Sequence, residues 1–445
     1  MPPAGTGSTT GRLSTSMSNT CLAPSLLSVC FRLSTEYFAM STSRLRPRCL
    51  SVLLAALLLW GGLPTASAQP QRAVRADTLY TMTGDPIENG VVLIENETIA
   101  AVGPASEVDV PASAEVHKAS VVTPGLIDPR GTVGLSGIYN VPADQDQLDT
   151  SEPMQPALRA LDAYNPREQL VSFVQQLGFT TVHTGHAPGA LISGQTATFS
   201  TAGTTVEASL RDSITTVAFT LGPDAQARFE SPGTRAKGVA MLRQALHDAQ
   251  AAMDGGEPEG GDLGQDVLQD VLRGEVPALI TAHRAHDIQT ALRLQEEFGF
   301  DLILDGAAEA YLMTEEIAEA DVPVILHPTM ARPSGTTQNA AFTTAGVLHD
   351  AGVPVAIQTG WEPYVPKTRI ALYEAAIAMA HGLPREAALA SITREAAEIL
   401  GLESVGTVAP GQRADLALFD GDPFEYTTHV CTVLSGGEVV SDECK

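Results

Sequence analysis

Residues 121–137 read VVTPGLIDPRGTVGLSG, and this stretch decides the fold. Two β-branched residues lead into the turn sequence Thr-Pro-Gly, after which come the apolar pair Leu126-Ile127 and then Asp128. Proline has no N–H to donate to a β-ladder, so Pro124 is expected at the start of a strand and not in its middle. The stretch therefore predicts a buried strand that is entered through a tight turn at Pro124 and ends near Asp128.

Short apolar runs alternate with helical patterns along the middle of the chain, which is typical of βα units and a parallel sheet. Their number is compatible with a (β/α)8-type barrel, in which the active site lies at the C-terminal ends of the strands. The strand candidates are residues 126–128, 180–183, 197–200, 215–219, 278–281, 301–304, 322–326 and 353–358.

The two ends of this region are β-rich. Residues 74–118 contain three short strand patterns separated by turn sequences, and residues 406–440 contain three more. We therefore expect residues 74–120 and 404–445 to form one small discontinuous β-sandwich domain around a barrel domain at 121–403.

Three stretches resemble the amidohydrolase superfamily, and imidazolonepropionase-like proteins in particular. They are TPGLID at 123–128, AHRAHDIQTALRLQEEFG at 282–299 and SITREAAEILGLESVGTVAPGQRADLALFDGDP at 391–423. The resemblance covers nearly all of the chain after residue 74. It implies an α/β fold, a (β/α)8 TIM-type barrel with a small split β-sandwich, and metal-dependent hydrolysis of C–N bonds in cyclic amides or dipeptide-like compounds.

The residues that hold the catalytic metal in this family are replaced here. The resemblance places a His-x-His pair after the first barrel strand, where this chain has Arg130 and Thr132. Arginine has no lone pair to give a metal, and a threonine hydroxyl is a poor substitute for imidazole. Gly306 stands at the position of the strand-6 histidine, and Gly360 at that of the strand-8 aspartate that accepts the water proton. The family pattern therefore predicts no metal site.

Polar residues nevertheless follow several predicted strands. His183, His283 and His327 are the candidates for a relocated site for zinc or a related divalent metal, because imidazole suits these ions. The alternative, which we favour, is that each histidine bonds to nearby backbone and orders a loop, since a metal needs three or four converging ligands. The residues expected to line the site are Asp128, Arg130, His183, His186, His283, Asp305, Glu309, His327 and Thr359.

Arg130 has two interpretations. Its guanidinium can form a structural ion pair with Asp128, Asp305 or Glu309, or it can bind a substrate carboxylate through two hydrogen bonds. The ion pair is favoured. Residues 186–195, HAPGALISGQ, are expected to form a flexible loop beside it that can cradle a ligand.

Two functions follow from these patterns. One is an exported hydrolase of C–N bonds, and the other is a catalytically inactive amidohydrolase-fold protein that binds a small molecule or a partner protein. A homo-oligomer is left open, because related proteins often associate. The net charge of −26, from 52 acidic and 26 basic residues, argues against nucleic acid and anionic membranes as partners.

The N-terminus predicts export. Basic residues at 44–48 precede an apolar run at 50–60, and Ala66-Ser67-Ala68 precedes Gln69 as a small-residue cleavage site. Residues 1–68 are therefore expected to be a disordered extension plus signal peptide, with translation starting at Met1 or Met40 and the product periplasmic or secreted. After cleavage no membrane span is expected, and of five cysteines Cys431 and Cys444 remain, either as a disulfide or as two thiols.

Overall fold

The computed structural model describes residues 71–139, 141–255, 261–327, 330, 333–361 and 367–445. The expected extension, signal peptide and cleavage site lie outside these residues. Among the helices that the structure describes, none has both the length and the hydropathy that a membrane crossing requires.

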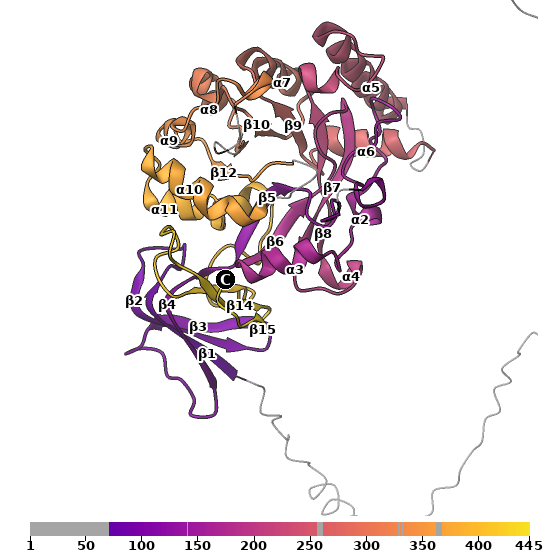
Figure 1. Cartoon of the computed structure of the whole chain (residues 1–445). Coiled ribbons are helices and arrows are strands. Elements are labelled where there is room, and N and C mark those ends of the chain that lie inside the picture. Colours follow the sequence, from indigo (N-terminus) through magenta and orange to yellow (C-terminus); the bar gives the residue numbers. More distant parts are fainter. Residues whose placement is uncertain (1–70, 140, 256–260, 328–329, 331–332, 362–366) are drawn as a thin grey trace, which may run out of the picture. The chain divides into compact units, whose positions relative to one another are not determined.

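An eight-stranded sheet forms the centre of the molecule (Figure 1). Its strands follow one another in chain order, and the two end strands, β5 and β12, lie beside each other, so the sheet is nearly closed into a barrel. Each of the eight predicted runs falls on one strand, which confirms the fold class. The strands are β5 (Leu126–Gly131), β6 (Phe179–Thr184), β7 (Ile192–Ser200), β8 (Leu210–Thr220), β9 (Ala278–Ala282), β10 (Leu302–Gly306), β11 (Val324–Leu326) and β12 (Val355–Ile357).

The expectation of an all-parallel barrel is wrong at β7. This strand pairs antiparallel with β6 on one side and with β8 on the other, whereas the remaining neighbours whose pairing is described run parallel. No helix separates β6 from β7, and only the short α4 (Val206–Ser209) separates β7 from β8. A short apolar run carries no information on strand direction, so the sequence pattern could not distinguish this arm from a βα unit.

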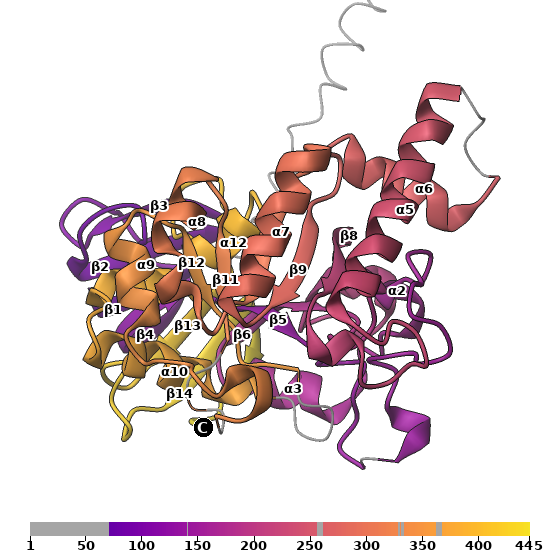
Figure 2. The ribbon, with the colours of Figure 1, turned by 90° about the horizontal axis from the view of Figure 1, so that it is seen from above.

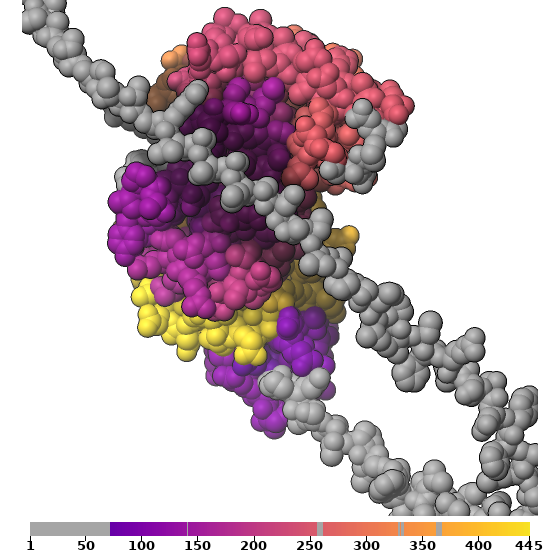
Figure 3. Space-filling view, turned by 90° about the vertical axis from the view of Figure 1, so that its right-hand side faces the viewer, coloured from indigo at the N-terminus to yellow at the C-terminus, as the bar shows by residue number. Residues whose placement is uncertain are grey.

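Helices cover the outside of the barrel, as Figures 1 and 2 show for α7 to α10. In the space-filling view, α5 and α6 form the upper end of the molecule, and the C-terminal strands lie next to the first strands of the chain (Figure 3). The helices are α2 (Ala160–Ala163), α3 (Gln169–Gln176), α4, α5 (Arg235–Gly255), α6 (Leu263–Leu272), α7 (Ala285–Phe298), α8 (Thr314–Glu319), α9 (Thr344–Asp350), α10 (Ala371–Ala380), α11 (Arg385–Ala390) and α12 (Arg394–Ile399).

A second sheet of seven strands joins the two ends of the described chain in the order β15-β14-β13-β4-β1-β2-β3. The domain limits given above stay a prediction, but the strands of this sheet do come from both predicted segments. They are β1 (Gln71–Leu79), β2 (Ile87–Glu95), β3 (Thr98–Pro104), β4 (Glu115–Pro124), β13 (Leu416–Phe419), β14 (Val430–Ser435) and β15 (Glu438–Ser441). A disulfide joins Cys431 to Cys444 across the β14–β15 hairpin.

The chain passes from the small sheet to the barrel at Gly125. Pro124 is the last residue of β4, paired with Leu416, and the barrel strand begins at Leu126. The prediction that Pro124 starts the barrel strand is therefore wrong, because Pro124 ends the preceding strand, β4. A Cβ atom built on Gly125 would lie 2.2 Å from the Oγ1 atom of Thr180, so only glycine fits this crossing.

We expect Gly125→Ala to destabilise the protein by about 1–3 kcal/mol, because the added methyl group must displace a buried strand residue. The measurement is the free energy of unfolding in urea. Gly84→Ala is the matched control, since its Cβ would meet nothing within 4 Å. Adding Thr180→Ala to Gly125→Ala should recover part of the loss, and no loss in the single variant would contradict the crossing described here.

The barrel interior has an apolar layer with polar residues above it. Ile127, Leu279, Ile303, Ile325 and Ala356 form a buried cluster with residues of α12. Side chains two positions apart on a strand share a face, so Thr281 and Asp305 stand over this layer at the C-terminal ends of β9 and β10. The functional site is therefore sought at this end of the barrel.

Candidate functional site

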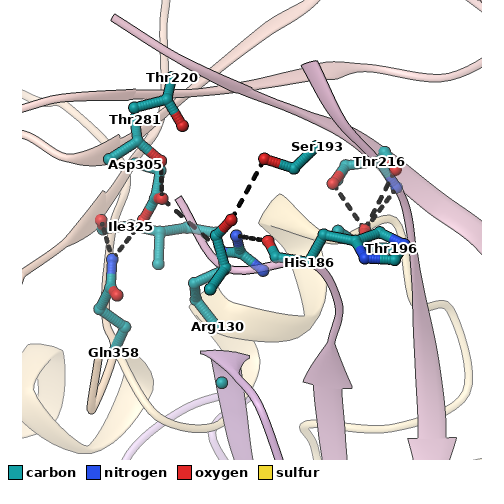
Figure 4. A network of polar contacts seen from close by, with 12 residues as sticks. Arg130, His186, Ser193, Thr196, Thr216, Thr220, Thr281, Asp305, Ile325 and Gln358 are labelled. Atoms are coloured by element: carbon teal, nitrogen blue, oxygen red, sulfur yellow. Dashed lines mark hydrogen bonds and ion pairs between the residues drawn. The ribbon is translucent and has the colours of Figure 1, made fainter. Parts of the chain in front are cut away.

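Arg130 is the central residue of the polar layer, and its side chain is fully buried (Figure 4). Its Nη2 atom donates to the backbone oxygen of His186 at 2.5 Å, and its Nε atom lies 3.6 Å from Oδ2 of Asp305. Burial lowers the pKa of this guanidinium, and the carboxylate of Asp305 opposes the effect. The guanidinium thus forms a buried ion pair with one of the three partners considered from the sequence.

Asp305 is anchored by two more residues in addition to Arg130. The hydroxyl of Thr281 donates to its Oδ2 atom, and the side-chain amide of Gln358 donates to Oδ1 at 2.5 Å. Gln358 also donates to the backbone oxygen of Ile325 at 3.0 Å. The carboxylate is therefore held by Thr281 of β9 and by Gln358, which follows β12, and it faces the guanidinium.

Asp128 does not pair with the guanidinium. Its Oδ2 atom accepts hydrogen bonds from the hydroxyls of Thr359, at 2.8 Å, and Thr368, at 2.5 Å. Its Oδ1 atom accepts from the backbone N–H of Arg130 at 3.2 Å. Burial raises the pKa of Asp128 to about 6, although these hydrogen bonds act in the opposite direction. Asp128 thus joins the first strand to the residues that follow the last strand.

His183 and His186 are both buried. The ring nitrogens of His183 bond to the backbone oxygen of Pro129, at 2.5 Å, and to the hydroxyl of Thr196, at 2.6 Å. Burial lowers the pKa of His183 to about 3 and that of His186 to about 4. Both rings are therefore neutral at pH 7, and His183 has no ring nitrogen left for a metal.

His283 and His327 face each other, with ring centroids 5.2 Å apart and an interplanar angle of 84°. Neither ring nitrogen of His283 has a hydrogen-bond partner among the described residues, and burial lowers its pKa to about 4. The structure thus brings these two histidines together, while His183 remains occupied by its own hydrogen bonds.

Glu309 belongs to a different set of contacts. It accepts hydrogen bonds from Arg284, at 2.8 Å, from the backbone N–H of Ala285, at 2.8 Å, and from Asn339, at 2.6 Å. Glu309 therefore caps the start of α7 and ties it to the segment around Asn339, and it takes no part in the Arg130 ion pair.

The prediction of a flexible loop at residues 186–195 is wrong, because the segment is packed inside the molecule and partly belongs to a strand. Residues 186–195 are buried throughout, and the last four belong to β7. Ala187 donates its N–H to the backbone oxygen of Gln147 at 2.6 Å, Ser193 donates to Ala187 at 3.2 Å, and Gly189 donates to Thr220 at 3.1 Å. The glycines in this segment allow close packing, and the segment closes over the guanidinium.

Sequence reasoning missed the hydroxyl and amide partners Thr196, Thr281, Gln358 and Thr368. Thr281 and Gln358 stand at the ends of predicted strands next to residues that were considered, so their position was a usable signal. Thr368 lies beyond the last strand, and nothing in its neighbourhood indicated contact with the first strand.

Comparison with known proteins agrees with this architecture. Residues 348–441 match the model of the amidohydrolase family. An amidohydrolase from Thermotoga maritima MSB8 superposes with a TM-score of 0.79 at 27% identity, over 83% of this chain and all of that one. The chain belongs to the amidohydrolase superfamily. As a member it resembles hydrolases over almost all of the residues that the structure describes.

Two curated relatives are similar over part of their length. Imidazolonepropionase of Paracoccus denitrificans is 37% identical over 97 residues, which is 21% of this chain and 24% of that protein. Amidohydrolase tasK of Hapsidospora irregularis is 24% identical over 426 residues, which is 83% of this chain. This chain spans only 41% of the length of tasK.

The superfamily implies a divalent metal at this end of the barrel, but the residues present do not fit one. Within the described residues, no group of three or more His, Cys, Asp or Glu side chains is gathered as a metal would require. The first position of the expected His-x-His pair carries the buried cation Arg130, which repels a metal ion. At Gly306, whose φ is +83°, a Cβ atom would lie 2.5 Å from the ring of His283, so a side chain there would require this ring to move.

Proposed function

We propose that this chain is an amidohydrolase-fold protein that binds a small molecule without metal-dependent hydrolysis. The observation that carries the proposal is the buried Arg130, which is held by Asp305 and the backbone of His186. The resemblance to the superfamily implies a first metal ligand at this position. A guanidinium fixed in this place supplies positive charge to the barrel without a Lewis acid or a metal-bound water.

The second function, a hydrolase of C–N bonds, is favoured by the superfamily and by the facing rings of His283 and His327. Two imidazoles leave a catalytic zinc site at least one protein ligand short. In addition, Gly360 provides no carboxylate to accept a proton from water. The ligand-binding function therefore agrees better with the residues present.

A hydrolysis assay separates the two functions. The chain is incubated with cyclic amides, N-acyl amino acids and dipeptides, each with added zinc or manganese and each with a chelator. We expect no turnover above that of a matched blank in any condition. Turnover that requires the added metal and disappears in His283→Ala would overturn the proposal and establish the hydrolase.

A further inference from the structure

The small sheet, whose strands β1 to β4 are labelled in Figure 1, carries a hollow of about 220 Å³. The hollow spans the neighbouring strands β4, β1 and β2, and Ala105 in the turn after β3 bounds it. It shares no lining residue with the polar layer around Arg130. Sites for drug-sized ligands have volumes of roughly 300–1,000 Å³, so this hollow suits a more compact group.

Two basic residues from adjacent strands line this hollow. Arg75 of β1 and Lys118 of β4 are directly paired in the parallel register of the two strands, and both are exposed. Paired residues on neighbouring strands point to the same face of a sheet, and the strands lie about 4.8 Å apart. The two positive charges therefore start from adjacent positions, an arrangement that destabilises a sheet unless a negative charge compensates for it.

Neither cation has a counter-charge in the part of the chain that the structure describes. Arg75 and Lys118 make no ion pair or side-chain hydrogen bond with any described residue, whereas Arg72 on the same strand forms two ion pairs. Asp77 is the single acidic residue among those that line the hollow, and it forms no ion pair with either cation. The lining thus offers two available cations against one carboxylate, although acidic residues outnumber basic ones by 52 to 26 in the whole chain.

Asn89 adds a neutral hydrogen-bond donor to the lining. Its backbone is held in the left-handed region, with φ at +49°, and its carbonyl oxygen accepts from the N–H of Ala105 at 2.9 Å. The side-chain amide of Asn89 has no hydrogen-bond partner among the described residues, so its two N–H groups can donate to a ligand. A guanidinium, an ammonium and an amide together suit a compact anion with several oxygens, and a phosphate group in particular, because a guanidinium can bind two of its oxygens at once.

We propose that this hollow binds a phosphate group, either inorganic phosphate or the terminal phosphate of a small monoester. Arg75 and Lys118 contact its oxygens, and the amide of Asn89 donates to another. A polyanion would face the acidic remainder of the chain, whereas a single phosphate group meets only the local excess of positive charge. The proposal goes beyond the function proposed for the barrel, because residues of the small sheet form this site, and it holds whether or not the barrel binds a ligand.

The test is isothermal titration calorimetry of the full chain with inorganic phosphate and with glycerol 3-phosphate, each in a chloride buffer of matched ionic strength. We expect saturable binding of at least one of them with a Kd between about 0.1 and 10 mM. Tighter binding of glycerol 3-phosphate would assign the site to monoesters, and tighter binding of inorganic phosphate would assign it to the free ion. Absence of saturable binding of both compounds up to about 50 mM would overturn the proposal.

Variants at exposed positions assign the binding to this hollow. Arg75→Gln and Lys118→Gln should each weaken phosphate binding at least about fivefold, because each removes one of the two cations. Asp77→Asn removes the single carboxylate of the lining and should strengthen binding at least about twofold. Arg293→Gln and Lys237→Gln are matched controls at exposed positions outside the hollow, and they should leave binding unchanged. Binding that survives both Arg75→Gln and Lys118→Gln, or that the controls weaken equally, would overturn the assignment.

Discussion

Arg130→Met is expected to destabilise the protein by about 3–5 kcal/mol, because it leaves the buried carboxylate of Asp305 without its cation. The methionine keeps much of the side-chain volume. The loss of stability therefore comes mainly from the missing charge and the missing hydrogen bond to His186, and less from a cavity. The free energy of unfolding in urea and the melting temperature both measure the effect. Arg293→Met, an exposed position, is the matched control and should change stability by less than about 0.5 kcal/mol.

A double-mutant cycle isolates the ion pair from other effects of the substitution. Asp305→Asn removes the negative charge and keeps a side chain that can bond to Thr281 and Gln358. The combined Arg130→Met and Asp305→Asn variant should lose less stability than the sum of the two single losses. A wild-type melting temperature in Arg130→Met would show that the ion pair contributes nothing to stability and would assign Arg130 to recognition.

The second large effect is a loss of stability in acid. Burial holds the pKa of His183 at about 3 and those of His186 and His283 at about 4, below the ordinary histidine value of 6.5. As pH falls below 6.5, these histidines bind protons in the unfolded chain but stay neutral in the folded one. Stability therefore falls between about pH 6.5 and pH 3–4, by roughly 2 kcal/mol per histidine at pH 5.

Asp128 acts in the opposite direction. Its pKa is raised from 3.8 to about 6, so between these values the folded chain binds a proton that the unfolded chain releases. Acidification from pH 7.5 to 5 therefore increases the free energy of unfolding by about 1 kcal/mol through Asp128. This gain is smaller than the loss of stability through the three histidines. Urea unfolding at pH 7.5 and pH 5 measures the sum, and we expect lower stability at pH 5.

Substitution of one histidine checks the origin of this dependence. His283→Gln removes a buried ring that makes no hydrogen bond within the described residues, and it should reduce the difference between pH 7.5 and pH 5 by roughly 2 kcal/mol. His349→Gln, at an exposed position, should leave the difference unchanged. An equal or larger difference in His283→Gln would contradict the assignment of acid sensitivity to this ring.

Much of the fold was predictable because burial in a barrel leaves a strong signal. Each barrel strand is a short apolar run, and the runs occur in the order that the sheet follows. The direction of β7 was not predictable, because an apolar run of this length reads the same in either direction. The place of Pro124 was missed because β4 and β5 are separated by Gly125 alone, so two strands in two sheets read as one.

The site was predictable in its residues but less so in its contacts. Arg130 and Asp305 lie one residue before the ends of β5 and β10, and His283 directly follows β9. The expected strand end near Asp128 is wrong, because β5 continues to Gly131. The in-and-out alternation of side chains along a strand could not identify the partner of Arg130, because the register of β5 against β6 shifts between Asp128 and Gly131. The buried state of residues 186–195 was also missed, because glycine permits both flexible loops and close packing.

The central claim, that Arg130 occupies the place of the superfamily metal, is tested most directly by metal content. The chain is purified without chelator, exposed to zinc and manganese, passed over a desalting column and analysed by elemental mass spectrometry. We predict well below one equivalent of any transition metal per chain. One or more equivalents of metal per chain, lost in His283→Ala but retained in His349→Gln, would contradict the claim and would support metal-dependent hydrolysis.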